Sequence, residues 1–109
     1  MISWHKIATH INEIPLQENG MGSIEVAGKK VTIGFHNNKY FACAYKCPHA
    51  GGILSQGHLD VLGNIVCPVH RYKFNPCNGR NTSGEGFWLQ HWKVEEREDG
   101  IWMEMSSSV

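Results

Sequence analysis

The feature that most constrains this chain is a pair of short boxes in which a cysteine is closely followed by a histidine. Cys47-Pro48-His49 is the first box, and Cys67-Pro68-Val69-His70 follows it after the intervening residues 50–66. Within each box the thiol and the imidazole lie too close in sequence to serve separate sites. The fold must therefore bring two loops together, so that four metal-binding side chains share one centre.

Two kinds of centre use two cysteines and two histidines. If the cysteines bind one metal and the histidines another, the set fits a [2Fe–2S] cluster in which two His replace two Cys on one iron. A single tetrahedral zinc ion is the alternative, although zinc modules commonly pair like ligands and each box here is mixed. The run Ala50-Gly51-Gly52 favours the cluster, because backbone without side chains can approach it closely.

Two further cysteines lie outside the boxes. With no export signal in the sequence, metal chemistry is favoured over disulfides. Cys43 shares a strand face with Phe41 and Tyr45, which predicts a small buried side chain. Cys77 lies in the turn 75–79 and is expected to be a spectator thiol. Neither is assigned to the metal centre.

Length and charge limit what the chain can do besides bind a metal. Its 109 residues suffice for one domain with a modest core. Ten basic residues balance ten acidic ones, so no one-sided charge points to nucleic acid or to an anionic membrane. No stretch approaches the roughly 20 apolar residues of a membrane span, and the N-terminus lacks a signal-peptide pattern. We therefore expect a cytoplasmic protein with no nucleic-acid or membrane partner.

Apolar residues alternate with polar ones in several short runs, and no run has a convincing helical period. The expected strands cover residues 24–26, 31–35, 40–45, 72–74, 89–94 and 101–103. Turns at 27–30 and 37–38 join the first three runs into an antiparallel meander, and Asp99-Gly100 is a hairpin signal. The prediction is an all-β domain over residues 1–105, a small antiparallel barrel or sandwich with the boxes on two loops. Residues 106–109 are expected to be a flexible C-terminal tail.

The two boxes, with Ala50-Gly51-Gly52 after the first and Arg71-Tyr72-Lys73-Phe74 after the second, resemble the cluster-binding boxes of the Rieske family. Nearly the whole chain is similar to small Rieske ferredoxins, although only the boxes are diagnostic. The resemblance implies one [2Fe–2S] cluster per chain as the cofactor. Cys47 and Cys67 would hold the buried iron through their thiolates, and His49 and His70 would hold the outer iron.

Within the resemblance, several positions indicate the low-potential branch. High-potential members join the loops by a disulfide at the positions of Gly52 and Val69. They also place hydrogen-bonding Ser and Tyr where this chain has Tyr72 and Phe74, and a phenylalanine cannot donate. Fewer donors to sulfur predict a potential near the lower end of the roughly −150 to +300 mV range. Many members also cover the cluster with a proline-containing loop, which Ser83-Gly84-Glu85-Gly86 replaces here.

The resemblance implies an electron carrier with no catalytic residues of its own. A flavin-containing reductase would be the donor, and a terminal oxygenase or other oxidoreductase the acceptor. A small subunit of another enzyme, such as a nitrite reductase, is an alternative, as is a structural zinc module. A free-standing oxygenase is disfavoured by the length of the chain, because no facial-triad pattern of two histidines and a carboxylate stands apart from the boxes. Phe87, Trp88 and Trp92 either line a docking surface or face the core.

Overall fold

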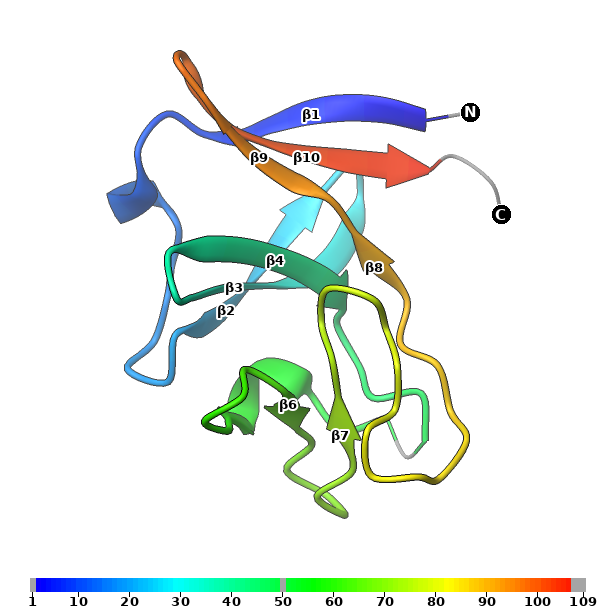
Figure 1. Cartoon of the computed structure of the whole chain (residues 1–109). Coiled ribbons are helices and arrows are strands. Elements are labelled where there is room, and N and C mark those ends of the chain that lie inside the picture. The colour runs from blue at the N-terminus through cyan, green and yellow to red at the C-terminus, as the bar shows by residue number, and fades with distance from the viewer. Residues whose placement is uncertain (1, 50, 107–109) are drawn as a thin grey trace.

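The computed structural model describes residues 2–49 and 51–106, and their regular structure is almost entirely β-strand (Figure 1). The strands are β1 (Ile2–Ala8), β2 (Met21–Val26), β3 (Lys29–His36), β4 (Lys39–Ala44), β5 (His58–Leu59), β6 (Ile65–Val66), β7 (Lys73–Phe74), β8 (His91–Trp92), β9 (Val94–Arg97) and β10 (Gly100–Ser106). Two short 3-10 turns, η1 (Ile11–Glu13) and η2 (Leu54–Gln56), complete the list. Within the described ranges, no helix is long and apolar enough to cross a membrane.

The strands form three antiparallel sheets in the orders β1-β10-β9, β2-β3-β4-β8 and β5-β6-β7. The expected meander is β2-β3-β4, and the expected hairpin at Asp99-Gly100 joins β9 to β10. Both meander turns use two successive left-handed residues, Ala27-Gly28 and Asn37-Asn38. Such pairs match the right-handed twist of the flanking strands, which explains why these short segments make tight hairpins.

The strands differ from the sequence-based expectation in three ways. β5 and β6, which lie between the two boxes, were not expected. The run 89–94 is split at Lys93: β8 pairs with β4, whereas β9 pairs with β10 in another sheet. β1 was not expected, and it pairs with the far end of the chain, from Ile2 opposite Ser106 onward. Ser106 therefore belongs to β10, and residues 107–109 of the expected tail lie outside the described residues.

The central sheet β2-β3-β4-β8 is covered on both faces. Alternate residues face the β1-β10-β9 sheet in one core, which includes Val31, Ile33, Ala42, Ile101 and Met103. The opposite face packs against the lobe that carries β5, β6 and β7, in a second core that includes Met21, Phe41, Leu54, Ile65 and Phe74. Figure 1 shows this lobe at the end of the molecule opposite β1 and β10. The metal-binding boxes lie in this lobe.

Side-chain amides in the β1–β2 connection fasten the lobe to the central sheet. The Asn19 amide donates to the carbonyl oxygens of Ser55 and Gly57, at 2.9 Å each, and its oxygen accepts from the Met21 N–H at 3.0 Å. Gln17 donates to the same Ser55 oxygen at 2.8 Å. These bonds satisfy backbone groups around η2 that no strand partner reaches.

Replacing Asn19 with alanine removes three of these hydrogen bonds at once. We expect the N19A variant to lose about 1–3 kcal/mol of stability, because the Gly57 oxygen loses the Asn19 donor and the Met21 N–H loses its Asn19 acceptor. The Ser55 oxygen keeps the bond from Gln17. Urea unfolding followed by tryptophan fluorescence measures the loss. The control is N12A, since Asn12 is exposed on η1; equal losses in the two variants would contradict the anchoring role.

Candidate metal centre

Each box forms a loop that is closed by the same two backbone hydrogen bonds. In the first loop the Cys47 N–H donates to the Gly52 oxygen at 2.8 Å, and the Gly51 N–H donates to the Cys47 oxygen at 3.0 Å. In the second loop the Cys67 N–H donates to the Tyr72 oxygen at 2.8 Å, and the Arg71 N–H donates to the Cys67 oxygen at 2.9 Å. Both loops are therefore copies of one backbone shape.

The fifth residue of each loop is left-handed, with φ 74° at Gly51 and 60° at Arg71. A third loop repeats the closure without a cysteine at its start: the Asn75 N–H donates to the Arg80 oxygen, and the Gly79 N–H donates to the Asn75 oxygen. Gly79 is left-handed as well, with φ 75°. All three loops have proline in second place, where a fixed φ near −65° favours the turn. The shared X-Pro pattern at residues 75–76 was the sequence signal for this third loop.

Position 52 has no room for a side chain, because Gly52 lies where the two loops meet. A Cβ added there would be 2.5 Å from Val69 Cγ2 and 3.2 Å from the Cys67 sulfur. At Gly51 an added Cβ would meet nothing within 4 Å, so space does not require glycine there. Glycine is favoured at this position because the backbone is left-handed. The two glycines after the first box thus serve different purposes, and Ala50 between the box and the glycines lies outside the described residues.

The two histidines of the boxes face each other through the same ring atom. Nδ1 of His49 lies 3.4 Å from Nδ1 of His70, and the ring centroids are 4.8 Å apart. A tetrahedral metal bonded to two imidazole nitrogens at about 2.1 Å holds them about 3.4 Å apart. The separation of the two nitrogens therefore fits one shared metal.

The cysteines of the boxes lie deeper than the histidines. Cys47 and Cys67 are buried in the lobe core, whereas His49 is half-buried and His70 is exposed. Among the described residues, no three His, Cys, Asp or Glu side chains are arranged to hold a single ion. A two-iron cluster needs only two protein ligands per iron, since bridging sulfides supply the rest. Two thiols inside and two imidazoles outside suit that division.

Aromatic rings hold His49 in place, which the sequence had not indicated. Tyr72 stacks on the His49 ring with centroids 4.0 Å apart and planes at 26°. Phe87 packs at a tilt against the same ring at 5.4 Å. Phe87 and Trp88 are exposed beside the loops, whereas Trp92 is buried in the core between the sheets. The sequence left open whether these three aromatic residues lie at the surface or in the core. Phe87 and Trp88 lie at the surface, and Trp92 lies in the core.

The segment expected to replace the proline-containing loop is organised by Asn81. Its amide nitrogen donates to the Lys73 oxygen at 2.9 Å, and its oxygen accepts the Gly86 N–H at 2.9 Å. Hydrogen bonds from Ser83 and Asn81 lower the pKa of Glu85, which keeps this carboxylate charged. Side-chain hydrogen bonds thus shape this segment, which contains no proline.

The two remaining cysteines lie outside the box loops, and Cys43 has the buried position that its strand context predicts. Cys43 is fully buried below the loops, and burial raises the pKa of its thiol, with a smaller opposing effect from a hydrogen bond with Thr32. Cys77 is exposed in the third loop. The net effect favours the neutral thiol of Cys43 over the thiolate.

Known proteins resemble this chain in sequence. A family model described as the Rieske [2Fe-2S] domain matches residues 3–86. A human Rieske domain-containing protein is 35% identical over 57 residues, which make up 50% of this chain and 36% of that protein. The ferredoxin component of an alkene monooxygenase system from Xanthobacter autotrophicus is 25% identical over 80 residues, 73% of this chain and 66% of that protein. The chain thus aligns with about one third and two thirds of these relatives' lengths.

Solved structures resemble the fold over its whole length. The ferredoxin of carbazole 1,9a-dioxygenase from Nocardioides aromaticivorans has a TM-score of 0.77 at 19% identity, covering 93% of this chain and 96% of that chain. A chain from a complex of reduced oxygenase and oxidised ferredoxin in carbazole 1,9a-dioxygenase also scores 0.77, at 24% identity over 97% and 96%. A protein described as an NADH-dependent nitrite reductase small subunit from Mycobacterium tuberculosis scores 0.81 at 13% identity over 99% of each chain. These likenesses confirm the predicted all-β fold.

Cysteines at positions 52 and 69 should join the two loops covalently. A Cβ at Gly52 would lie 3.5 Å from the Val69 Cβ, at the short end of the range of about 3.5–4.5 Å found in disulfides. We expect the G52C/V69C variant to form this disulfide in air, as shown by thiol counting and peptide mapping.

The matched control is G51C/V69C, because a Cβ at Gly51 has no neighbour within 4 Å. Free thiols at both positions in the oxidised G52C/V69C variant, or a bridge from position 52 to Cys67, would contradict the loop geometry.

Proposed function

Because this chain belongs to the Rieske [2Fe–2S] domain family, we propose that it is a one-electron carrier whose cluster is held by Cys47, Cys67, His49 and His70. A [2Fe–2S] cluster is the cofactor of this domain. The observation that carries the ligand assignment is the 3.4 Å separation of the two histidine Nδ1 atoms. The zinc alternative loses its support, since the family's centre is the iron–sulfur cluster.

The ligand set explains why such a site accepts an electron readily. Two thiolates offset the formal charge of the oxidised cluster, and neutral imidazoles add none, so the site is neutral before reduction and singly negative afterwards. Four thiolates would place the same electron on a site that is already negative. Replacing two of them by His49 and His70 removes that repulsion and raises the potential relative to plant-type ferredoxins.

The exposed imidazole edges are the proposed exit for the electron. His70 is exposed, and His49 lies beside it, braced by the stacked ring of Tyr72. Val69, which precedes His70, and Phe87, which packs against the His49 ring, add exposed apolar surface there, at 48% and 37% exposure. A partner that covers this apolar rim would exclude water and come close to the histidines. The chain itself needs no catalytic residue for this role.

We infer that the donor is a flavin-containing reductase and the acceptor a terminal oxygenase. The alkene monooxygenase ferredoxin component and the ferredoxin–oxygenase complex of carbazole dioxygenase support this assignment. The fold of the nitrite reductase small subunit supports the second candidate, a subunit of another oxidoreductase. Reoxidation of the reduced protein by an oxygenase, but not by a nitrite reductase catalytic subunit, would distinguish the two acceptors.

The proposed potential lies near the lower end of the family range. Phe74 is fully buried in the same core as Cys47 and Cys67, and it has no hydroxyl that could donate to a ligand sulfur. Without that donor, the extra charge of the reduced site is less stabilised. The reduced state is correspondingly harder to form.

The central test is an anaerobic reductive titration of the purified protein. A red-brown protein that takes up about one electron per chain, with a paramagnetic signal of low average g value, supports the carrier. C67S should lose the iron and the colour, because a buried ligand is removed. C77S is the matched control and should keep both, since Cys77 is exposed outside the boxes. Iron retained by C67S, or a colourless protein that binds zinc, would overturn the assignment.

Exchanging one histidine for a thiolate should lower the midpoint potential. We expect the starting protein to titrate below about 0 mV, and H70C to keep a cluster whose midpoint is lower by roughly 100 mV or more. H58C provides the control, because His58 is exposed outside both boxes. Spectroelectrochemistry measures all three midpoints. An unchanged midpoint in H70C would mean that His70 is not a ligand or that ligand charge does not set the potential.

A further inference from the structure

The neutral total charge of the chain conceals a separation of charge along its length. Between residues 45 and 90, which include the three loops and the lobe, four basic residues stand against two acidic ones. The remainder has six basic residues against eight acidic ones. Residues 45–90, the lobe together with its three loops, therefore carry a net charge of plus two, and the rest of the chain carries minus two. The basic residues of the lobe are Lys46, Arg71, Lys73 and Arg80, all exposed.

The two charged regions are far enough apart for a partner to sense them separately. The molecule is elongated, with principal extents of 38 × 32 × 19 Å. Figure 1 shows the lobe at one end, and the β9–β10 turn with its acidic residues Glu98 and Asp99 at the other. At physiological salt the Debye length is about 8 Å, so each end acts as an independent surface. The lobe stays positive even after the site takes up one electron.

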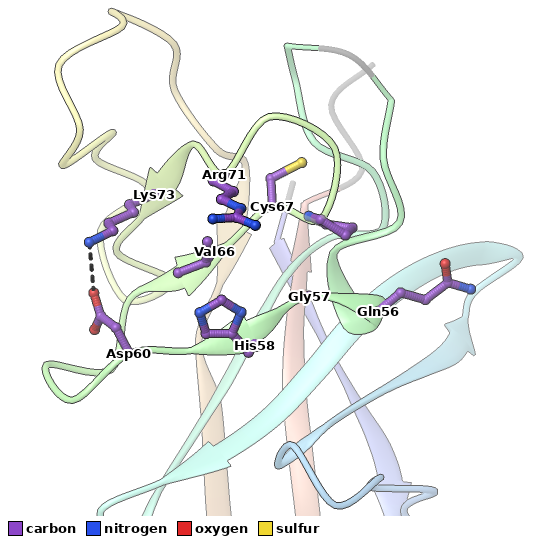
Figure 2. Close-up of a pocket in the computed structure, with 9 residues that line it drawn as sticks. Gln56, Gly57, His58, Asp60, Val66, Cys67, Arg71 and Lys73 are labelled. Atoms are coloured by element: carbon purple, nitrogen blue, oxygen red, sulfur yellow. Dashed lines mark ion pairs between the residues drawn. The ribbon is translucent and has the colours of Figure 1, made fainter.

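A hollow of about 630 Å³ lies beside the second box loop (Figure 2). Cys67 and Pro68 form part of its wall, and the Arg71 and His58 side chains extend toward it from different strands and loops. Lys73 lies at its edge, 3.9 Å from the Asp60 carboxylate. Burial acts to raise the pKa of Asp60, but hydrogen bonds from Asn64 and Leu62 outweigh it and lower the pKa. One carboxylate thus balances only one of the two cations.

Arg71 occupies a position where the other loops have glycine. Its φ of 60° is left-handed, as at Gly51 and Gly79 in the equivalent positions of the other two loops. This conformation is unfavourable for residues with a side chain and natural for glycine. An exposed arginine kept in a strained position next to His70 indicates a role for its charge outside the fold.

We propose that the lobe end, with the hollow beside the second box and its Arg71 and Lys73, is a docking surface for an acidic face of a redox protein partner. The inference rests on the proposed carrier function, because docking here brings the partner to the exposed edge of His70. Charge complementarity indicates which partner binds here, because the positive lobe attracts a negatively charged protein surface. The exposed apolar side chain of Val69 adjoins this surface. Like charges would hold an acidic partner away from the far end, so the dipole also orients the encounter.

Two chemically defined electrode surfaces test this orientation with the intact protein. Gold coated with a carboxylate-terminated monolayer stands in for an acidic partner, and an amine-terminated monolayer serves as its opposite. At about 10 mM salt the charges are weakly screened. We expect adsorption to both, because each end meets an opposite charge. Rapid electron exchange in voltammetry is expected only on the carboxylate surface, since the amine surface holds the cluster at the far side.

Variants connect the effect to the named residues. R71G/K73Q should bind the carboxylate surface about threefold or more weakly, as measured by surface plasmon resonance, and its fast voltammetric wave should shrink. The control K6Q/K93Q removes the same charge from exposed positions outside the lobe and should leave both readouts unchanged. R71G alone should unfold at the same or a higher temperature than the starting protein, which excludes misfolding as the cause of weaker binding.

Each outcome decides the question. Equal exchange on both surfaces, faster exchange on the amine surface, or equal losses in the two double variants would overturn the docking surface. Adsorption abolished by sodium phosphate but not by sodium chloride of equal ionic strength would overturn it in favour of a small-anion site. Absence of a one-electron wave in a mediated solution titration would overturn the carrier function itself. A normal solution wave with no surface preference would overturn the docking surface alone.

Discussion

Closure of each Cys loop by two backbone hydrogen bonds is the constraint on which the candidate site depends. The bonds hold the cysteine at the base of the loop and place the fifth residue in the left-handed region. Proline, the second residue of each loop, has a fixed φ that suits this turn. With both loops in this shape, His49 and His70 reach across to each other through Nδ1. Gly52 then has to lack a side chain, because Val69 of the other loop occupies that space. Residue identities in the boxes thus follow from one repeated backbone geometry.

The lobe is held rigidly because the central sheet serves two cores. Odd-numbered residues of β4, Phe41 and Cys43, pack under the loops, whereas Ala42 between them packs against the β1-β10-β9 sheet. A change in the orientation of the lobe would therefore disturb both cores and the amide contacts of Asn19. Close packing of this kind resists small displacements. Such resistance suits an electron carrier, whose ligands should move little between the two charge states.

Short sequence patterns predicted the features that depend on neighbouring residues, namely the strands and tight turns of the meander. Alternation and the turn pairs at 27–28 and 37–38 were sufficient to predict the meander. The box spacing was sufficient to predict that His49 and His70 lie together. β1 was missed because its partner in β10 lies at the opposite end of the chain, where no local turn signal reports it. The stacking of Tyr72 on His49 depends on how the chain turns at Arg71, a left-handed residue that sequence rules assign to glycine. The separation of charge between the lobe and the rest of the chain was likewise missed, because a net charge of zero does not say where the charged residues lie.

The positive charge of the lobe raises the reduction potential, whereas the lack of a hydrogen-bond donor at Phe74 lowers it. The sizes of the two effects determine which one dominates. One exposed charge about 10 Å from the centre contributes about 0.4 kcal/mol in water, or roughly 20 mV for one electron. The net plus two of the lobe therefore raises the potential by roughly 40 mV before salt screens it. A hydrogen bond to a charged acceptor contributes about 1.5–3 kcal/mol, roughly 65–130 mV. Burial of Phe74 in place of a donor outweighs the surface cations, so charge at the lobe directs encounters more than it sets the potential.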